Sequence, residues 1–146
     1  MIRLRVLRVS ASLRQRFIFQ VCGGTVNFES TVCVESQVSS GVRFRVARMS
    51  FGRRVELMRR VRELAGRVEF LEAGTGAGDR MDAGVLRAEI DRLYLLWGLR
   101  GIEGLWLDGV EATPELLVDS GPEELFREAL AAVRAAAGLD EGERKN

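Results

Sequence analysis

The chain has 146 residues, 47% of them apolar and 29% charged, which is long enough and apolar enough for one globular domain with its own core. Its formal net charge of +1 gives no global reason to expect binding to nucleic acid or to a membrane surface. Histidine is absent, which excludes serine–histidine and cysteine–histidine catalytic arrangements and removes the commonest general base and metal ligand.

The charges are distributed unevenly along the chain. Residues 1–50 carry eight arginines against two glutamates, whereas residues 104–146 carry ten acidic residues against four basic ones. Such a chain either pairs its two ends internally or presents two faces of opposite sign to partners. Cys22 and Cys33 form no CxxC motif, so we expect two free thiols in a reducing cytoplasm.

Residues 1–30 differ from the rest of the chain. Ile2, Leu4 and Val6 alternate with arginines, as in an edge strand, but no period continues after them. We therefore expect residues 1–30 to be a poorly packed or extended N-terminal segment, or an extension upstream of the natural start. Residues 31–146 are expected to form a single α+β domain.

A β-hairpin is predicted at the start of this domain. The segments TVCVES from Thr31 and VRFRVAR from Val42 both alternate between apolar and polar residues, and the Ser39–Gly41 stretch between them has turn chemistry. Arg43 and Arg45 would face water on the second strand.

Two antiparallel helices are predicted next. Ser50 is an N-cap for a helix over residues 51–72, whose apolar stripe consists of Leu57, Val61, Leu64, Val68 and Leu71. The glycine-rich loop at residues 73–78 follows a helix and lacks a Gly-Lys-Ser/Thr ending, so it is predicted to be a linker and not a phosphate loop. Asp79 or Asp82 would cap the second helix, which runs to Trp97.

The stretch from Leu86 to Thr113 organises the fold. Leu86, Ile90, Leu93 and Trp97 form a helical seam, and Gly98 is predicted to end that helix in the left-handed conformation with Leu99 packing back onto it. A short strand pair with an Asp108-Gly109 turn should follow.

The C-terminal part is predicted to be helical. Thr113-Pro114 starts a short helical turn, a longer helix covers residues 123–137, and Gly138 ends it. The fold class is therefore α+β, with an N-terminal β-hairpin, a two-helix antiparallel core, a short β-turn element and C-terminal helices.

The apolar residues of the β-turn element are candidates for partner binding. Ile102, Leu105, Trp106 and Leu107 cannot all face one side of a strand, so either both sides are covered or one side presents an apolar patch.

Arginines form the second candidate surface. Residues 43–67 contain nine arginines against Glu56 and Glu63, and Arg53 and Arg60 are candidate contacts. This helix face is either simply solvated, or it binds an acidic protein or nucleic acid. No catalytic residue, cofactor site or metal site is predicted, because no convergent polar cluster is found and the acidic residues form no metal-binding loop.

Several short motifs of the C-terminal half resemble those of the tail assembly chaperones of long-tailed bacteriophages. The matching segments are Ile102-Glu103-Gly104-Leu105, Asp108-Gly109, Thr113-Pro114-Glu115-Leu116-Leu117, Gly121-Pro122-Glu123-Glu124-Leu125 and the Lys145-Asn146 ending. The resemblance covers about residues 31–146. Ile102 stands where an aromatic residue is common, and residues 1–30 have no counterpart.

This resemblance implies a non-enzymatic role. Such chaperones bind a long tape measure protein, keep it soluble in the cytoplasm of the bacterial host, and help to recruit tail tube subunits. The alternatives are a small arginine-rich nucleic-acid-binding regulator and a structural tail or head-completion protein. A homo-oligomer is compatible with each of these, and no membrane partner is expected.

Overall fold

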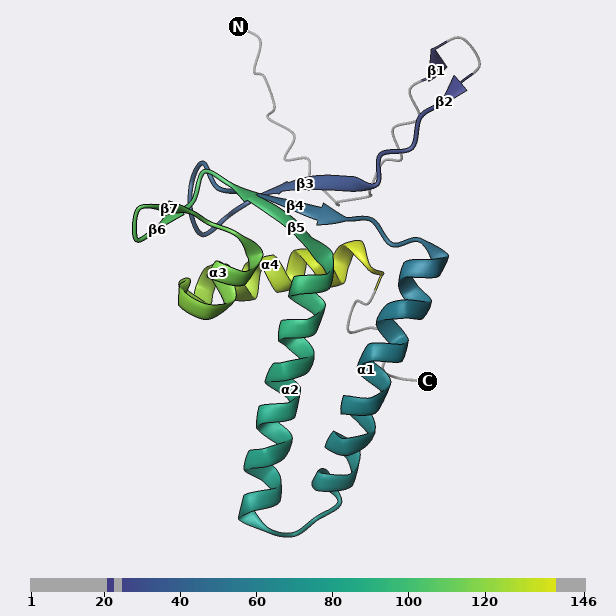
Figure 1. Cartoon of the computed structure of the whole chain (residues 1–146), viewed down its shortest axis with the longest axis vertical. Coiled ribbons are helices and arrows are strands. Elements are labelled where there is room, and N and C mark those ends of the chain that lie inside the picture. The colour runs from purple at the N-terminus through teal and green to yellow at the C-terminus, as the bar shows by residue number, and fades with distance from the viewer. Residues whose placement is uncertain (1–20, 23–24, 139–146) are drawn as a thin grey trace, which may run out of the picture.

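The computed structural model describes residues 21–22 and 25–138, and in this part the chain has the predicted α+β architecture (Figure 1). The expectation for residues 1–30 falls mostly on positions outside the described residues. Within them, the backbone of β1 (Val21–Cys22) pairs antiparallel with that of β2 (Thr25–Val26).

A three-stranded antiparallel sheet follows, in the order β3-β4-β5. The predicted hairpin is confirmed as β3 (Thr31–Glu35) and β4 (Arg43–Ala47), and Gly41 in the connecting turn has φ +85°. β5 (Leu99–Glu103) lies on the other side of β4, with a register shift between Arg45 and Val46. Arg43 and Arg45 face water, as predicted, and both approach Glu103 of the neighbouring strand.

Helices α1 (Phe51–Glu72) and α2 (Ala77–Gly98) form the predicted antiparallel hairpin, which projects away from the sheet (Figure 1). The Ser50 hydroxyl accepts a hydrogen bond from Arg53 N at 3.4 Å, which confirms the N-cap. α2 begins earlier than predicted, because the carboxylate of Asp79, inside the first turn, accepts from the backbone N–H of Gly76 at 3.2 Å.

Gly98 ends α2 in a different way from the prediction. It is the last helical residue, its φ is not positive, and the chain passes at Leu99 directly into β5. A Cβ at Gly98 would lie 2.3 Å from Cγ1 of Val133. The glycine is therefore needed for the close approach of α2 to the C-terminal helix, and the left-handed turn that we predicted is wrong.

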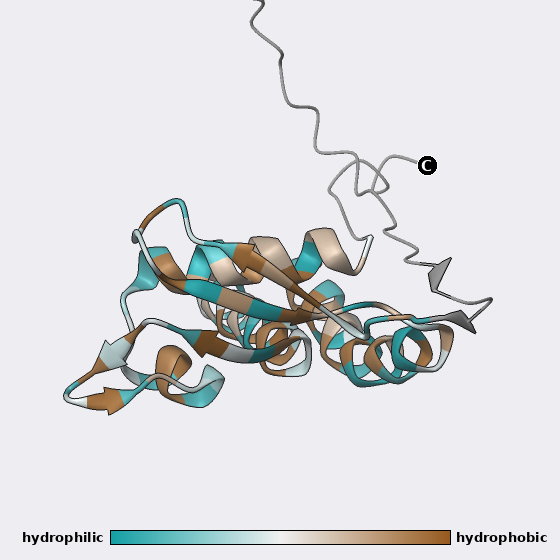
Figure 2. Ribbon diagram, turned by 90° about the horizontal axis from the view of Figure 1, so that it is seen from above, coloured by the Kyte–Doolittle hydropathy of each residue, from teal (hydrophilic) through white to brown (hydrophobic). Residues whose placement is uncertain are grey.

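Helices α3 (Pro114–Ser120) and α4 (Glu123–Ala136) lie under the sheet, and Figure 2 shows the sheet crossing over α4. Thr113 caps α3, and Gly138, at φ +66°, ends the C-terminal helix as predicted. The core lies between the sheet and α4, and its members come from all the surrounding elements: Val42, Phe44, Val46, Leu95, Leu99, Ile102, Leu117, Leu125, Ala129 and Val133.

Polar contacts join the two halves of the chain around this core. Glu128 of α4 accepts hydrogen bonds from the Ser36 hydroxyl and the Gln37 backbone N–H, both in the β3–β4 loop. Arg134 of α4 pairs with Asp91 of α2. Arg43 and Arg45 pair with Glu103, just before the acidic segment, and among the described residues no ion pair joins an arginine of residues 1–50 to an acidic residue of residues 104–146.

Candidate protein-binding site

The predicted strand pair is present as a hairpin of β6 (Trp106–Leu107) and β7 (Val110–Glu111). Its turn residues Asp108 and Gly109 have φ +50° and +79°, the conformation of a two-residue turn that matches the twist of a hairpin. The Leu105 carbonyl accepts a hydrogen bond from Ala112 N at 2.9 Å, which fastens the base of the hairpin.

The hairpin has one covered side and one open side. Leu105 and Leu107 are half-buried and pack against the core, because residues two apart point to the same face of a strand. Trp106 points to the other face and is 66% exposed. The two sides of the hairpin are therefore not both covered, and the apolar surface that faces water on the open side comes from Trp106.

The other predicted contact residues do not join this patch. Ile102 is 4% exposed and belongs to the core, so it is not available to a partner in this conformation. Arg53 stacks on the Trp97 ring, 4.4 Å from its centroid, and donates a hydrogen bond to the Trp97 carbonyl at 2.9 Å. Arg60 pairs with Glu56 on the exposed face of α1. Both arginines lie on α1, at the other end of the sheet from β6 and β7 (Figure 1).

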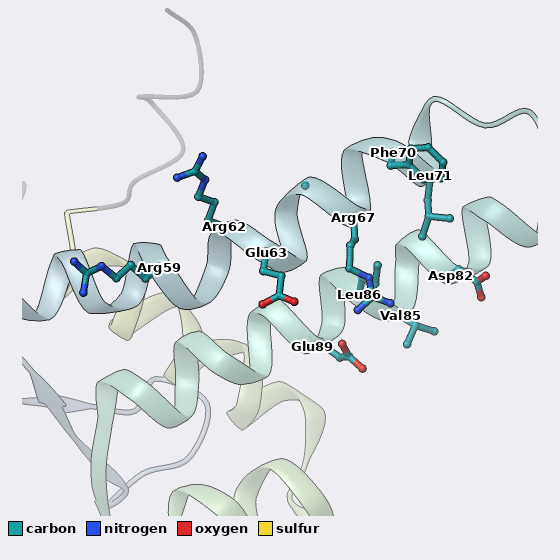
Figure 3. A pocket seen from close by; sticks show the side chains of 11 residues that line it. Arg59, Arg62, Glu63, Arg67, Phe70, Leu71, Asp82, Val85, Leu86 and Glu89 are labelled. Carbon is teal, nitrogen blue, oxygen red and sulfur yellow. The ribbon is translucent and has the colours of Figure 1, made fainter.

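A second candidate surface, which we call the helical groove, runs between α1 and α2 (Figure 3). It has a volume of about 880 Å³ and is lined by Phe70 and Leu71 of α1 and by Val85 and Leu86 of α2. Phe70 is 79% exposed and Val85 59%. Leu86 is buried and Leu71 half-buried, so the apolar surface that stays open to water in the groove comes from Phe70 and Val85.

Charged side chains border the helical groove with opposite signs on its two sides. Arg59, Arg62 and Arg67 lie on α1, with Glu63 as the only acidic residue there, whereas α2 contributes Asp82 and Glu89. Figure 3 shows the side chains of Glu63 and Arg67 directed toward α2 and that of Arg62 directed away from it. A ligand that fills this groove therefore needs an apolar stripe between an acidic and a basic edge.

The apolar surface continues from the helical groove toward the body of the protein. Val85 and Glu89 also border a smaller hollow of about 370 Å³, whose apolar walls are Leu117 and Val118 of α3 and Phe126 of α4. Met81, 74% exposed, lies one helical turn from Val85. Sequence analysis did not single out Phe70, Met81 or Val85, because each lies off the apolar stripe of its own helix.

Within residues 21–22 and 25–138, no group of three or more histidine, cysteine or acidic side chains could hold a metal ion. None of the helices in this part is long and apolar enough to cross a membrane. Compared with models of protein families, with curated proteins and with solved structures, the chain matches none.

Proposed function

We propose that this protein is a non-enzymatic assembly chaperone that binds an amphipathic helix of a longer client protein. The observation that carries the proposal is the helical groove, in which Phe70 and Val85 remain exposed between charged edges of opposite sign. Recognition of an amphipathic helix in an apolar groove is a common mode of peptide binding, and it requires no catalytic group.

Covering the exposed apolar side chains of the groove would contribute to the free energy of client binding. The exposed part of the Phe70 side chain amounts to about 150 Å², and covering it is worth about 4 kcal/mol at ~25 cal/mol per Å². Association costs about 4–15 kcal/mol in lost translational and rotational freedom, so Val85 and the charged edges of the groove must contribute to binding as well. Between Arg59 and Phe70 the groove follows three turns of α1, so a client helix of about four turns fills it.

The resemblance of the C-terminal motifs to those of phage tail assembly chaperones suggests a tape measure protein as the client. A tape measure protein is a long helical chain whose apolar stripes must stay covered until tail tube subunits surround it. We propose that this protein covers such a stripe in the cytoplasm of a bacterial host and brings tube subunits to it. Trp106 on the β6–β7 hairpin supplies a second apolar contact, at some distance from the helical groove.

Coexpression with a tape-measure-like protein encoded next to this chain tests the proposal. We expect the client to be insoluble alone, and to be soluble and co-purified when the wild-type chain is present. Phe70→Glu should lower the amount of soluble client about fivefold or more, since the apolar stripe of the client offers no partner for a charge in the groove.

Met58→Glu is the matched control. Met58 is also on α1 and 64% exposed, but it does not line the groove, so this variant should behave like the wild-type chain. A client that stays insoluble with the wild-type chain, or equal losses for the two variants, would count against the proposal. Trp106→Ser measures the contribution of the hairpin in the same assay.

A further inference from the structure

A third hollow, at the N-terminal end of α1, has a chemistry that differs from both apolar surfaces. We call it the arginine cavity: it has a volume of about 490 Å³ and is bordered by Arg45 of β4, Arg48 of the following loop, Arg53 of α1 and Arg100 of β5. The hydroxyl side chains of Ser30, Thr31 and Ser50 complete its polar wall. No aspartate or glutamate of the described residues lines it.

The four arginines are poorly compensated by acidic side chains. Arg45 has one carboxylate nearby, with its Nε 3.8 Å from Oε1 of Glu103, whereas Arg48, Arg53 and Arg100 form no ion pair with any residue in the described part of the chain. The Nε of Arg53 is buried and finds no hydrogen-bond acceptor among the same residues. The like charges of these side chains repel one another, and an anion bound in the cavity would relieve that repulsion.

Two backbone features support anion binding in the cavity: one adds to its positive potential, and the other makes room for an arginine at its side. α1 has no acidic residue in its first turn, so its own sequence does not neutralise the positive end of the helix dipole. Gly101 of β5 provides the space in which the Arg45 side chain lies, because a Cβ there would be 2.6 Å from Nη2 of Arg45. The guanidinium of Arg45 thus lies over Gly101, at the side of the cavity.

We propose that the arginine cavity binds the phosphate group of a nucleotide, either free or within a single strand of nucleic acid. The guanidinium groups of Arg45, Arg48 and Arg100 offer more donors than one carboxylate accepts, whereas a phosphate accepts several charge-assisted hydrogen bonds at once. Phe28 also lines the cavity, and it is 58% exposed, with Cζ of Arg48 5.8 Å from its ring centroid. Its ring offers a surface on which a base stacks while the arginines hold the phosphate.

Titration calorimetry at low salt tests this site with two probes, sodium pyrophosphate and a short oligothymidylate. The wild-type chain should bind each with saturation at one site. The double variant Arg48→Gln/Arg100→Gln should weaken binding about 100-fold, which is about tenfold for each arginine that contacts the anion. Competition between the two probes places them in the same cavity, and the tighter probe identifies the source of the phosphate.

Arg59→Gln/Arg62→Gln is the matched control, because it removes the same charge from α1 outside the arginine cavity. It should change the affinity by about twofold or less through long-range electrostatics. Gly101→Ala, which displaces the Arg45 side chain without altering any charge, should weaken binding by about tenfold, with the fold checked by circular dichroism. Absence of saturable binding by the wild-type chain, or equal weakening in the control, would overturn the proposal.

Discussion

A glycine-to-alanine substitution should have opposite effects on stability at two positions of α2. At Gly98 it should destabilise the fold, because Gly98 contacts Val133 of α4. Gly98→Ala would place a Cβ 2.3 Å from Cγ1 and 3.0 Å from Cγ2 of Val133. Carbon atoms in contact lie about 3.5–4.0 Å apart, so α2 and α4 would have to separate by about 1 Å. Val133 is in the core and its β-branched side chain has little freedom to turn away, so we expect the free energy of unfolding to fall by about 1–3 kcal/mol.

Gly84→Ala is the matched substitution in the same helix. No atom lies within 4 Å of a Cβ at Gly84, so the added methyl group meets nothing. Since alanine is the better helix former, this variant should raise the free energy of unfolding by about 0.5–1 kcal/mol. Urea denaturation followed by circular dichroism measures both changes.

A double variant separates the steric effect from any general intolerance at Gly98. Val133→Ala removes the two methyl groups that the new Cβ would meet, and should itself cost about 1–3 kcal/mol. In the double variant the alanine at Gly98 occupies part of the vacated space, so the loss should be smaller than the sum of the single losses by about 1 kcal/mol or more. Strict additivity, or a stabilising Gly98→Ala, would refute the packing of α2 against α4 described above.

Three further substitutions test single contacts by the same urea denaturation. Glu128→Ala should cost about 1–3 kcal/mol and speed hydrogen exchange in the β3–β4 loop, which loses its two bonds to α4; unchanged exchange would contradict those bonds. Gly109→Ala should cost about 1 kcal/mol because its φ is +79°, and a stability equal to wild type would argue against the left-handed turn. Arg53→Met should cost about 1–2 kcal/mol and shift the fluorescence of Trp97, on which it stacks; an unaltered spectrum would exclude that stacking.

Local signals were sufficient to predict most of the secondary structure. Ser50 and Thr113 are capping residues directly before helices, and the stripe from Leu57 to Leu71 repeats with helical spacing, so each could be recognised without knowledge of the rest of the chain. The β6–β7 hairpin was predicted from the Asp-Gly pair alone, since few other sequences adopt that turn.

Features that depend on tertiary contacts could not be predicted in this way. Leu95 is fully buried although it lies opposite the seam of Leu86 and Trp97, because the last turns of α2 pass between α1 and the body of the protein. β5 becomes a sheet strand only through its pairing with β4. The role of Gly98 depends on Val133, which is 35 positions later in the sequence.

The candidate surfaces could be predicted only in part, for the same reason. Trp106 was singled out from its strand, but its exposure depends on Leu105 and Leu107 facing the core. The arginine cavity brings together side chains from β4, β5 and α1, and the run of arginines in the sequence did not indicate which of them meet. Arg100 lies outside that run altogether.

The shape of the helical hairpin explains why apolar side chains are exposed on α1 and α2. α1 packs mainly on α2 and has little other support, so the half of the hairpin that projects from the sheet is covered on one side only (Figure 1). Helices gain most of their stability from burying an apolar face, and each helix of a hairpin can bury only the side that faces its partner. Phe70, Met81 and Val85 lie in this projecting half, and each of them is more than half exposed. A helical client in the groove would supply the missing layer, which is why we propose client binding at this hairpin and treat Trp106 as a proposed second contact.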